Sequence, residues 1–266
     1  MKNRNNLRVT IIAIIIAVIL KLILFALAVF LIKIYKQIEV TDGYNLTHLL
    51  CSLIIDISLI IYLYRRLEIK IEWWCNVKIS SLILLILISI SVFFLSLPFV
   101  DLKEYFVRLL SGEFSVYKFS LERILHSNIE SITYFIFMVF AVPVAEEIIF
   151  RGFLLKLMLR RYSVFVSLIF TSLIFAVVHL RFTGIGYLII YGLLFSYSFW
   201  KTKSLIIPIL LHVIINLLSQ LTVIQTTKLE NKYISIMGIS LLLCIMVSIM
   251  LLTFFRKDNE KETYNN

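Results

Sequence analysis

Two adjacent carboxylates and a guanidinium, Glu146, Glu147 and Arg151, lie in an otherwise apolar stretch of the sequence. An ionisable group at membrane depth costs at least ~2.5–3.5 kcal/mol on insertion scales, so it needs a partner or a function. Glu147 and Arg151 are four residues apart, so on a helix they share a face and can neutralise each other. Glu146 lies about 100° round the helix. We therefore predict that Glu147 is anchored and that Glu146 is available for chemistry; the alternative is a helix end frayed into the membrane interface.

Two histidines in separate apolar segments are candidate partners for Glu146. If the helix that carries Glu146 continues to a turn near Ser163, the carboxylate lies about 22 Å from that turn, at 1.5 Å per residue. His179 lies about 24 Å up the returning helix by the same measure. The two side chains are therefore expected at the same depth. His212 and Asn216 are four residues apart on a further apolar segment, so they share a face and favour a polar cavity.

Several known peptidase mechanisms lack their residues in this sequence. No nucleophilic Ser or Cys paired with a base is evident within the expected spans, no His is followed by Glu, and no Gly-x-Ser-x-Gly sequence occurs. Asp56 is the one aspartate inside an expected span, so a paired-aspartate mechanism has no second member. Water activated by a carboxylate remains, because burial raises the pKa of a carboxylic acid toward the range of a general base.

In this mechanism Glu146 activates the water, and His179 shares it or protonates the leaving amine. His212 and the Asn216 amide could donate hydrogen bonds to the developing oxyanion. Alternatively, Glu146, His179 and His212 form a His₂Glu zinc site with one open position. The residues alone leave both mechanisms open. In either case the pair formed by Glu147 and Arg151 supports the site.

The composition is that of an integral membrane protein. The 266 residues are 61% hydrophobic and 16% charged, with a mean hydropathy of +0.99, whereas soluble domains are roughly 45–50% apolar and 25% charged. We predict an all-α, polytopic membrane protein of about eight transmembrane helices, with seven as the alternative. The expected spans are about 9–32, 47–64, 79–100, 131–155, 163–183, 185–200, 204–223 and 233–255.

The charges fit a multi-pass protein of the cell membrane. The formal net charge of +10 is concentrated in short loops, where Lys and Arg set orientation and meet lipid headgroups. Their distribution favours both termini in the cytoplasm, a lipid bilayer as partner and no nucleic acid. The three cysteines are scattered, so no disulfide framework or cysteine-based metal site is expected.

Two features precede the candidate site. Lys21 and Asp56 fall in the middle of the first and second expected spans at similar depth, so we predict an ion pair that braces the two helices and is not catalytic. Residues 101–130 are amphipathic and predict a helix lying in the interface, or else a plain connector. The chain is expected to form one unit with three parts: 1–130, N-terminal helices and interfacial segment; 131–223, catalytic helical core; 224–266, last membrane helix and polar tail.

Three short motifs resemble those of the CPBP intramembrane proteases, the CAAX-processing and bacteriocin-processing family also called Abi. The motifs are Glu-Glu-x-x-x-Arg, Phe-x-x-x-His and His-x-x-x-Asn, each in a separate membrane helix. In this chain they begin at Glu146, Phe175 and His212. The resemblance covers about 131–218. One departure is Ser196, where members often carry a second glycine after Gly192.

The resemblance implies that Glu146 is the water-activating base, His179 its partner, and His212 with Asn216 the oxyanion site. It implies no cofactor, with zinc as the alternative. The partner would be a membrane-associated peptide or protein, trimmed in bacteriocin or pheromone processing or in self-immunity. The competing class is a non-catalytic immunity or scaffold protein of the same fold. The loop charges put the cluster toward the outer half of the membrane, whereas the prenyl-protein branch implies access from the cytosol.

Overall fold

A computed structural model of the chain describes residues 2–35, 42–67, 69–73, 77–96, 113–119, 129–179 and 185–228. Within these residues the protein is helical, as the all-α prediction requires, apart from one two-stranded ribbon. The expected eighth span, 233–255, the polar tail and most of the 101–130 segment lie outside the described residues.

The first seven expected spans all correspond to helices. The long helices are α1 (Lys2–Tyr35), α2 (Asp42–Leu67), α3 (Ile79–Ser96), α9 (Val164–Val178), α10 (Ile185–Thr202) and α11 (Ile206–Leu221), and the fourth span is the helical run 129–159. Two stretches in the described part are long and apolar enough to cross a membrane, Asn6–Leu24 and Ser131–Leu159. Shorter apolar helices cover Ile79–Phe93, Val164–Val178 and Ile206–Leu221.

The helical run 129–159 contains two wider, π-helical turns. It comprises α6 (Ile129–Ile136), a π segment at Phe137–Ala141, α7 (Val142–Glu147), a second π segment at Ile148–Leu155 and α8 (Lys156–Leu159). The first π segment precedes Pro143, which has no backbone N–H to continue the helical ladder. The N–H of Val142 donates to the carbonyl of Phe137, five residues back. Such single wide turns are frequent at functional sites.

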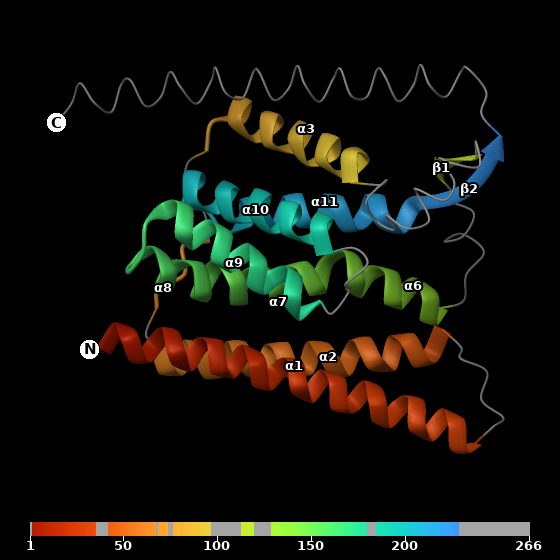
Figure 1. Cartoon of the computed structure of the whole chain (residues 1–266), viewed down its shortest axis with the longest axis horizontal. Coiled ribbons are helices and arrows are strands. Elements are labelled where there is room, and N and C mark those ends of the chain that lie inside the picture. The colour runs from red at the N-terminus through yellow and green to blue at the C-terminus, as the bar shows by residue number, and fades with distance from the viewer. Residues whose placement is uncertain are drawn as a thin grey trace.

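The helices lie side by side with roughly parallel axes (Figure 1). α1 packs against α2, α9 against α10, and α11 against both α10 and α3. The run 129–159 lies between the α1–α2 hairpin and the α10–α11 pair, and it contacts α2, α9 and α11. Phe153, Leu154, Leu155 and Phe195 are fully buried in the resulting core. The polar motifs are thus carried by helices at the centre of the bundle.

The ribbon pairs β1 (Glu113–Phe119) with β2 (Thr222–Lys228), antiparallel, with Glu113 opposite Lys228 and Phe119 opposite Thr222. The helix expected over 101–130 is therefore wrong for 113–119. The physical reason is visible in the partner strand, because Thr222–Lys228 is rich in β-branched Thr, Val and Ile, which favour strands. The ribbon brings the 113–119 segment to the end of α11.

Candidate functional site

Glu147 and Arg151 form a fully buried ion pair, as predicted from their spacing. Arg151 Nη1 donates to Glu147 Oε1 at 2.8 Å, and neither side chain has any solvent exposure. The second guanidinium nitrogen, Nη2, donates to the Gly192 carbonyl at 3.0 Å. The guanidinium also lies over the rings of Phe175 and Phe195, 4.7 and 5.2 Å from their centroids. The ion pair thereby ties α7 and the second π segment to α9 and α10.

Glu147 also holds His212. Its Oε1 lies 2.9 Å from His212 Nδ1, and because a carboxylate accepts, Nδ1 must carry the proton. The imidazole stacks on Phe195 with ring centroids 4.6 Å apart and an interplanar angle of 21°. The opposite nitrogen, Nε2, is then the one that faces Glu146, with Nε2 and Glu146 Oε2 3.8 Å apart.

His179 has its orientation fixed by its own helix. It ends α9, and Nδ1 lies 2.6 Å from the carbonyl oxygen of Phe175. A carbonyl can only accept, so Nδ1 is the protonated nitrogen and Nε2 of the neutral ring carries a lone pair. This lone pair is on the nitrogen that lies 3.7 Å from Glu146 Oε1. His179 is therefore set up to accept a proton or a hydrogen bond on the side of Glu146.

Glu146 is the carboxylate left without an anchoring partner. Its side chain is 16% exposed, against 0% for Glu147, and its buried Oε2 has no hydrogen-bond partner in the described part of the chain. The two imidazole separations, 3.7 and 3.8 Å, exceed a direct hydrogen bond, so both Nε2 atoms face the carboxylate without bonding to it. The predicted pairing of Glu147 with Arg151 and the predicted convergence of Glu146 and His179 are confirmed, whereas the availability of Glu146 for chemistry stays a prediction.

Asn216 shares a helix face with His212 but makes a contact that the sequence did not predict. Its Nδ2 donates to the Met138 carbonyl at 3.0 Å. In a regular α-helix the N–H of Val142 would donate to this carbonyl. In the π segment Val142 donates to Phe137 instead, and the next residue, Pro143, has no N–H. The amide nitrogen carries two hydrogens, so one remains beyond this bond.

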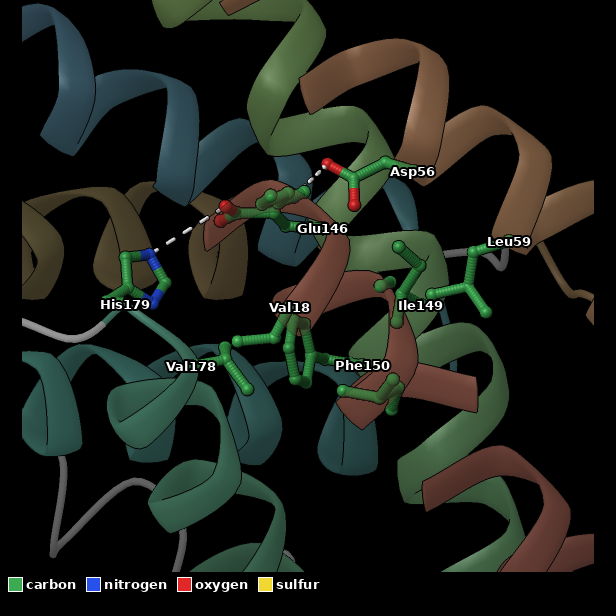
Figure 2. Close-up of a pocket in the computed structure, with 11 residues that line it drawn as sticks. Val18, Asp56, Leu59, Glu146, Ile149, Phe150, Val178 and His179 are labelled. Carbon is green, nitrogen blue, oxygen red and sulfur yellow. Dashed lines mark hydrogen bonds and ion pairs between the residues drawn. The ribbon is translucent and has the colours of Figure 1, made fainter. Parts of the chain in front are cut away.

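A cavity of about 70 Å³ lies beside Glu146 and His179. Figure 2 shows Glu146 between Asp56 of α2 and His179 of α9. The predicted ion pair of Lys21 and Asp56 is confirmed, with Nζ and Oδ2 2.7 Å apart, and both residues line this same cavity. The sequence predicts the pair as a brace between two helices, but it does not show that the pair borders the site. A larger apolar groove of about 440 Å³ lies between α1 and α2 and shares Ala17 and Leu59 with the cavity.

Glu146, His179 and His212 are the side chains of the site that could bind a metal ion. In the described residues, no group of three or more His, Cys, Asp or Glu side chains has the arrangement of a metal site. The zinc alternative would use Glu146 with Nε2 of His179 and His212, the nitrogens that face it. The residue types suit zinc, so a chelator experiment is needed to separate the two mechanisms.

Ser196, the departure from the family pattern, lies in the α9–α10 contact. It is fully buried, and its hydroxyl is 3.5 Å from that of Ser172. At Gly192, one turn earlier, an added Cβ would lie 2.9 Å from the Ser172 Cβ. Position 192 thus has no room for a Cβ, whereas the serine at position 196 is accommodated in the same helix contact.

The comparison with protein families identifies the segment that contains these residues. Residues 128–218 match the family described as Rce1-like, type II CAAX prenyl endopeptidase. No curated protein and no solved structure matches the chain. The match spans 91 of the 266 residues, about a third, and it covers all three motifs. The match supports the resemblance of this segment to the CPBP, or CAAX-processing, intramembrane proteases.

Proposed function

We propose that this protein is a multi-pass intramembrane endopeptidase that hydrolyses a membrane-associated peptide or protein with water activated by Glu146. The observation that carries the proposal is the position of the Glu146 carboxylate, 3.7 and 3.8 Å from the Nε2 atoms of His179 and His212. A water in the cavity beside these groups would be close to a base and to an imidazole at once.

The hydrogen-bond directions support a different proposed task for each histidine. Glu146 and the lone pair on Nε2 of His179 both face the water, so together they can remove its proton. His179 can then pass that proton to the leaving amine. For His212 to donate to the oxyanion, Nε2 must also carry a proton, so the ring must be an imidazolium. Two carboxylates and one guanidinium leave one negative charge in the cluster, and this imidazolium would balance it. The second amide hydrogen of Asn216 would complete the oxyanion site.

We further propose that the substrate is a precursor peptide, such as a bacteriocin or pheromone, or a peptide toxin removed in self-immunity. Peptidomics of membranes and medium from the host cell tests both the peptidase activity and the proposed class of substrate. Cells carrying Glu146→Gln are compared with the parent at equal membrane levels of the protein. The matched control is Glu72→Gln, which alters a half-exposed carboxylate paired with Lys156 outside the cluster.

Uncleaved precursors are expected to accumulate in the Glu146→Gln cells and not in the Glu72→Gln cells. Glu146→Ala is expected to give the same result. An unchanged peptide profile in both Glu146 variants would rule out the peptidase and leave the non-catalytic immunity or scaffold function. A changed profile without bacteriocin- or pheromone-like peptides would retain the enzyme and replace its substrate.

A further inference from the structure

Lys21 of α1 lies on the wall of the cavity that also borders Glu146 and His179. Apart from these three residues and Asp56, the described residues that line the cavity are apolar. His179 is neutral in the tautomer assigned above, so the ammonium is the one formal positive charge among the described lining residues. A ligand that enters the cavity and reaches Glu146 therefore also comes close to this cation.

The ammonium has donors to spare. It carries three N–H groups, and the contact with Asp56 Oδ2 at 2.7 Å uses one of them. In the described chain the ion pair of Lys21 is with Asp56 and not with Glu146. The Lys21 side chain is 29% exposed, against 8% for Asp56, so the ammonium is the more accessible member of the pair. Within the described residues, two N–H groups are thus left for a ligand.

The cavity does not border the residues proposed above as oxyanion donors. Neither His212 nor Asn216 is among the described residues that line it. Negative charge that develops between apolar walls is poorly hydrated, and a cation already in place stabilises it far more than in water. A carbonyl oxygen that turns toward this cavity during the attack by water would meet the ammonium of Lys21.

We propose that Lys21 is a further catalytic residue, which donates a hydrogen bond from the α1 side to the oxyanion formed at the scissile carbonyl. The inference rests on the proposed function, because it requires hydrolysis at Glu146. Asp56 is then a positioning residue that holds the ammonium at the cavity wall. The ion pair predicted as a brace between α1 and α2 thereby gains a catalytic task.

The charge moves during the reaction while the ammonium keeps its protons. Glu146 and His179 take one proton from the water, the water oxygen bonds to the carbonyl carbon, and the C=O π electrons move onto the oxygen. When the C–N bond breaks, its electron pair leaves with the nitrogen, which receives the proton from His179, and the oxyanion becomes a carbonyl again. The contact with Lys21 exists only while the oxyanion does, which is the kind of contact that raises kcat.

Uptake of heavy oxygen measures the hydrolysis without knowledge of the peptide that is cut. The purified protein in liposomes is incubated in H₂¹⁸O with the membrane peptide extract of Glu146→Gln cells, in which uncleaved precursors are expected to accumulate. Each cut places one ¹⁸O atom in a new carboxylate, and mass spectrometry counts these atoms. Rates are expressed per folded molecule, and denaturant titration in detergent micelles gives the free energy of unfolding of each variant.

Lys21→Met combined with Asp56→Leu removes both charges and leaves an apolar contact between α1 and α2, so the stability should be retained. The rate should nevertheless fall by about 10²–10³, the effect of removing one oxyanion donor. Lys21→Met with Asp56→Asn is a second neutral pair and should show the same loss. Lys21→Arg keeps a cationic donor and should cleave well above either pair. Lys156→Met with Glu72→Gln, which removes an ion pair outside the cavity, is the matched control and should keep the rate.

A structural brace predicts that cleavage follows stability. Parental rates per folded molecule in the neutral pairs, or a Lys21→Arg rate as low as theirs, overturn the proposal. Uptake of ¹⁸O that depends on Glu146 and not on Lys21 refutes the assignment of Lys21 alone. Uptake by the parent protein no greater than that by Glu146→Gln protein refutes the peptidase, and the role of Lys21 with it.

Discussion

Glu147 holds His212 through a 2.9 Å contact between Oε1 and Nδ1, while the same oxygen accepts from Arg151 at 2.8 Å. One buried carboxylate oxygen therefore connects the first motif to the third. This fixes which imidazole nitrogen faces Glu146. The histidine and the arginine depend on the same acceptor, so changes at Glu147 are expected to affect both stability and geometry.

Glu147→Leu is expected to lower the free energy of unfolding by about 3–5 kcal/mol, because it leaves the buried Arg151 without a counter-charge. Glu147→Leu combined with Arg151→Met removes both charges and should cost less than the single change. The two single variants, Glu147→Leu and Arg151→Met, and the double variant are measured by denaturant titration in detergent micelles. A double variant that is as unstable as the sum of the two single variants would contradict the direct ion pair.

Asn216→Ala is expected to destabilise the protein by about 0.5–1.5 kcal/mol, because the partly buried hydrogen bond to the Met138 carbonyl is lost. If the second amide hydrogen also serves the oxyanion, cleavage by the folded variant should fall by about 10²–10³. Ser219→Ala is the matched control, since in the described part of the chain that hydroxyl bonds within α11, to the carbonyl of Ile215. Unchanged cleavage per folded Asn216→Ala molecule would restrict the residue to its structural contact.

Gly192→Ala is expected to destabilise the bundle by about 1–3 kcal/mol through overpacking. The new Cβ would lie 2.9 Å from the Ser172 Cβ and 3.0 Å from its Cα, so the backbones of α9 and α10 must separate. Gly186→Ala on the same helix is the control, because nothing lies within 4 Å of its added Cβ. It should be neutral or slightly stabilising. Equal melting temperatures for the two variants would refute the close approach.

Chelators separate the two mechanisms. Treatment of membranes with 1,10-phenanthroline or EDTA is expected to leave substrate cleavage unchanged, since the proposed mechanism uses only side chains and water. A loss of cleavage that added zinc restores would instead assign Glu146, His179 and His212 as metal ligands. Manganese or magnesium in place of zinc serves as the control for non-specific recovery.

The central part of the site could be predicted from spacing alone. The i, i+4 rule gave the pair of Glu147 and Arg151, and helix rise gave the meeting of Glu146 and His179, because straight helices convert residue counts into depth. Apolar length likewise located the helices that carry the three motifs. The eight membrane crossings and the orientation of the termini remain predictions.

Other features depend on contacts between segments far apart in the chain, which spacing does not encode. The acceptor of Arg151 Nη2 is the Gly192 carbonyl, and the acceptor of Asn216 is the Met138 carbonyl. Pro143 has no N–H, and in a regular α-helix this would leave the Val139 carbonyl unserved; the π segment shifts the unserved carbonyl to Met138. The strand at 113–119 was missed because its partner lies more than a hundred residues away.

The α1–α2 hairpin supplies Lys21 and Asp56 to a cavity whose other polar residues, Glu146 and His179, come from the segment that matches the family. The cavity beside Glu146 is thus walled in part by helices outside the matched segment. We expect homologues that keep the three motifs and this ion pair and exchange the rest of the first two helices to perform the same hydrolysis on different peptides, so grafting this hairpin is a route to new selectivity.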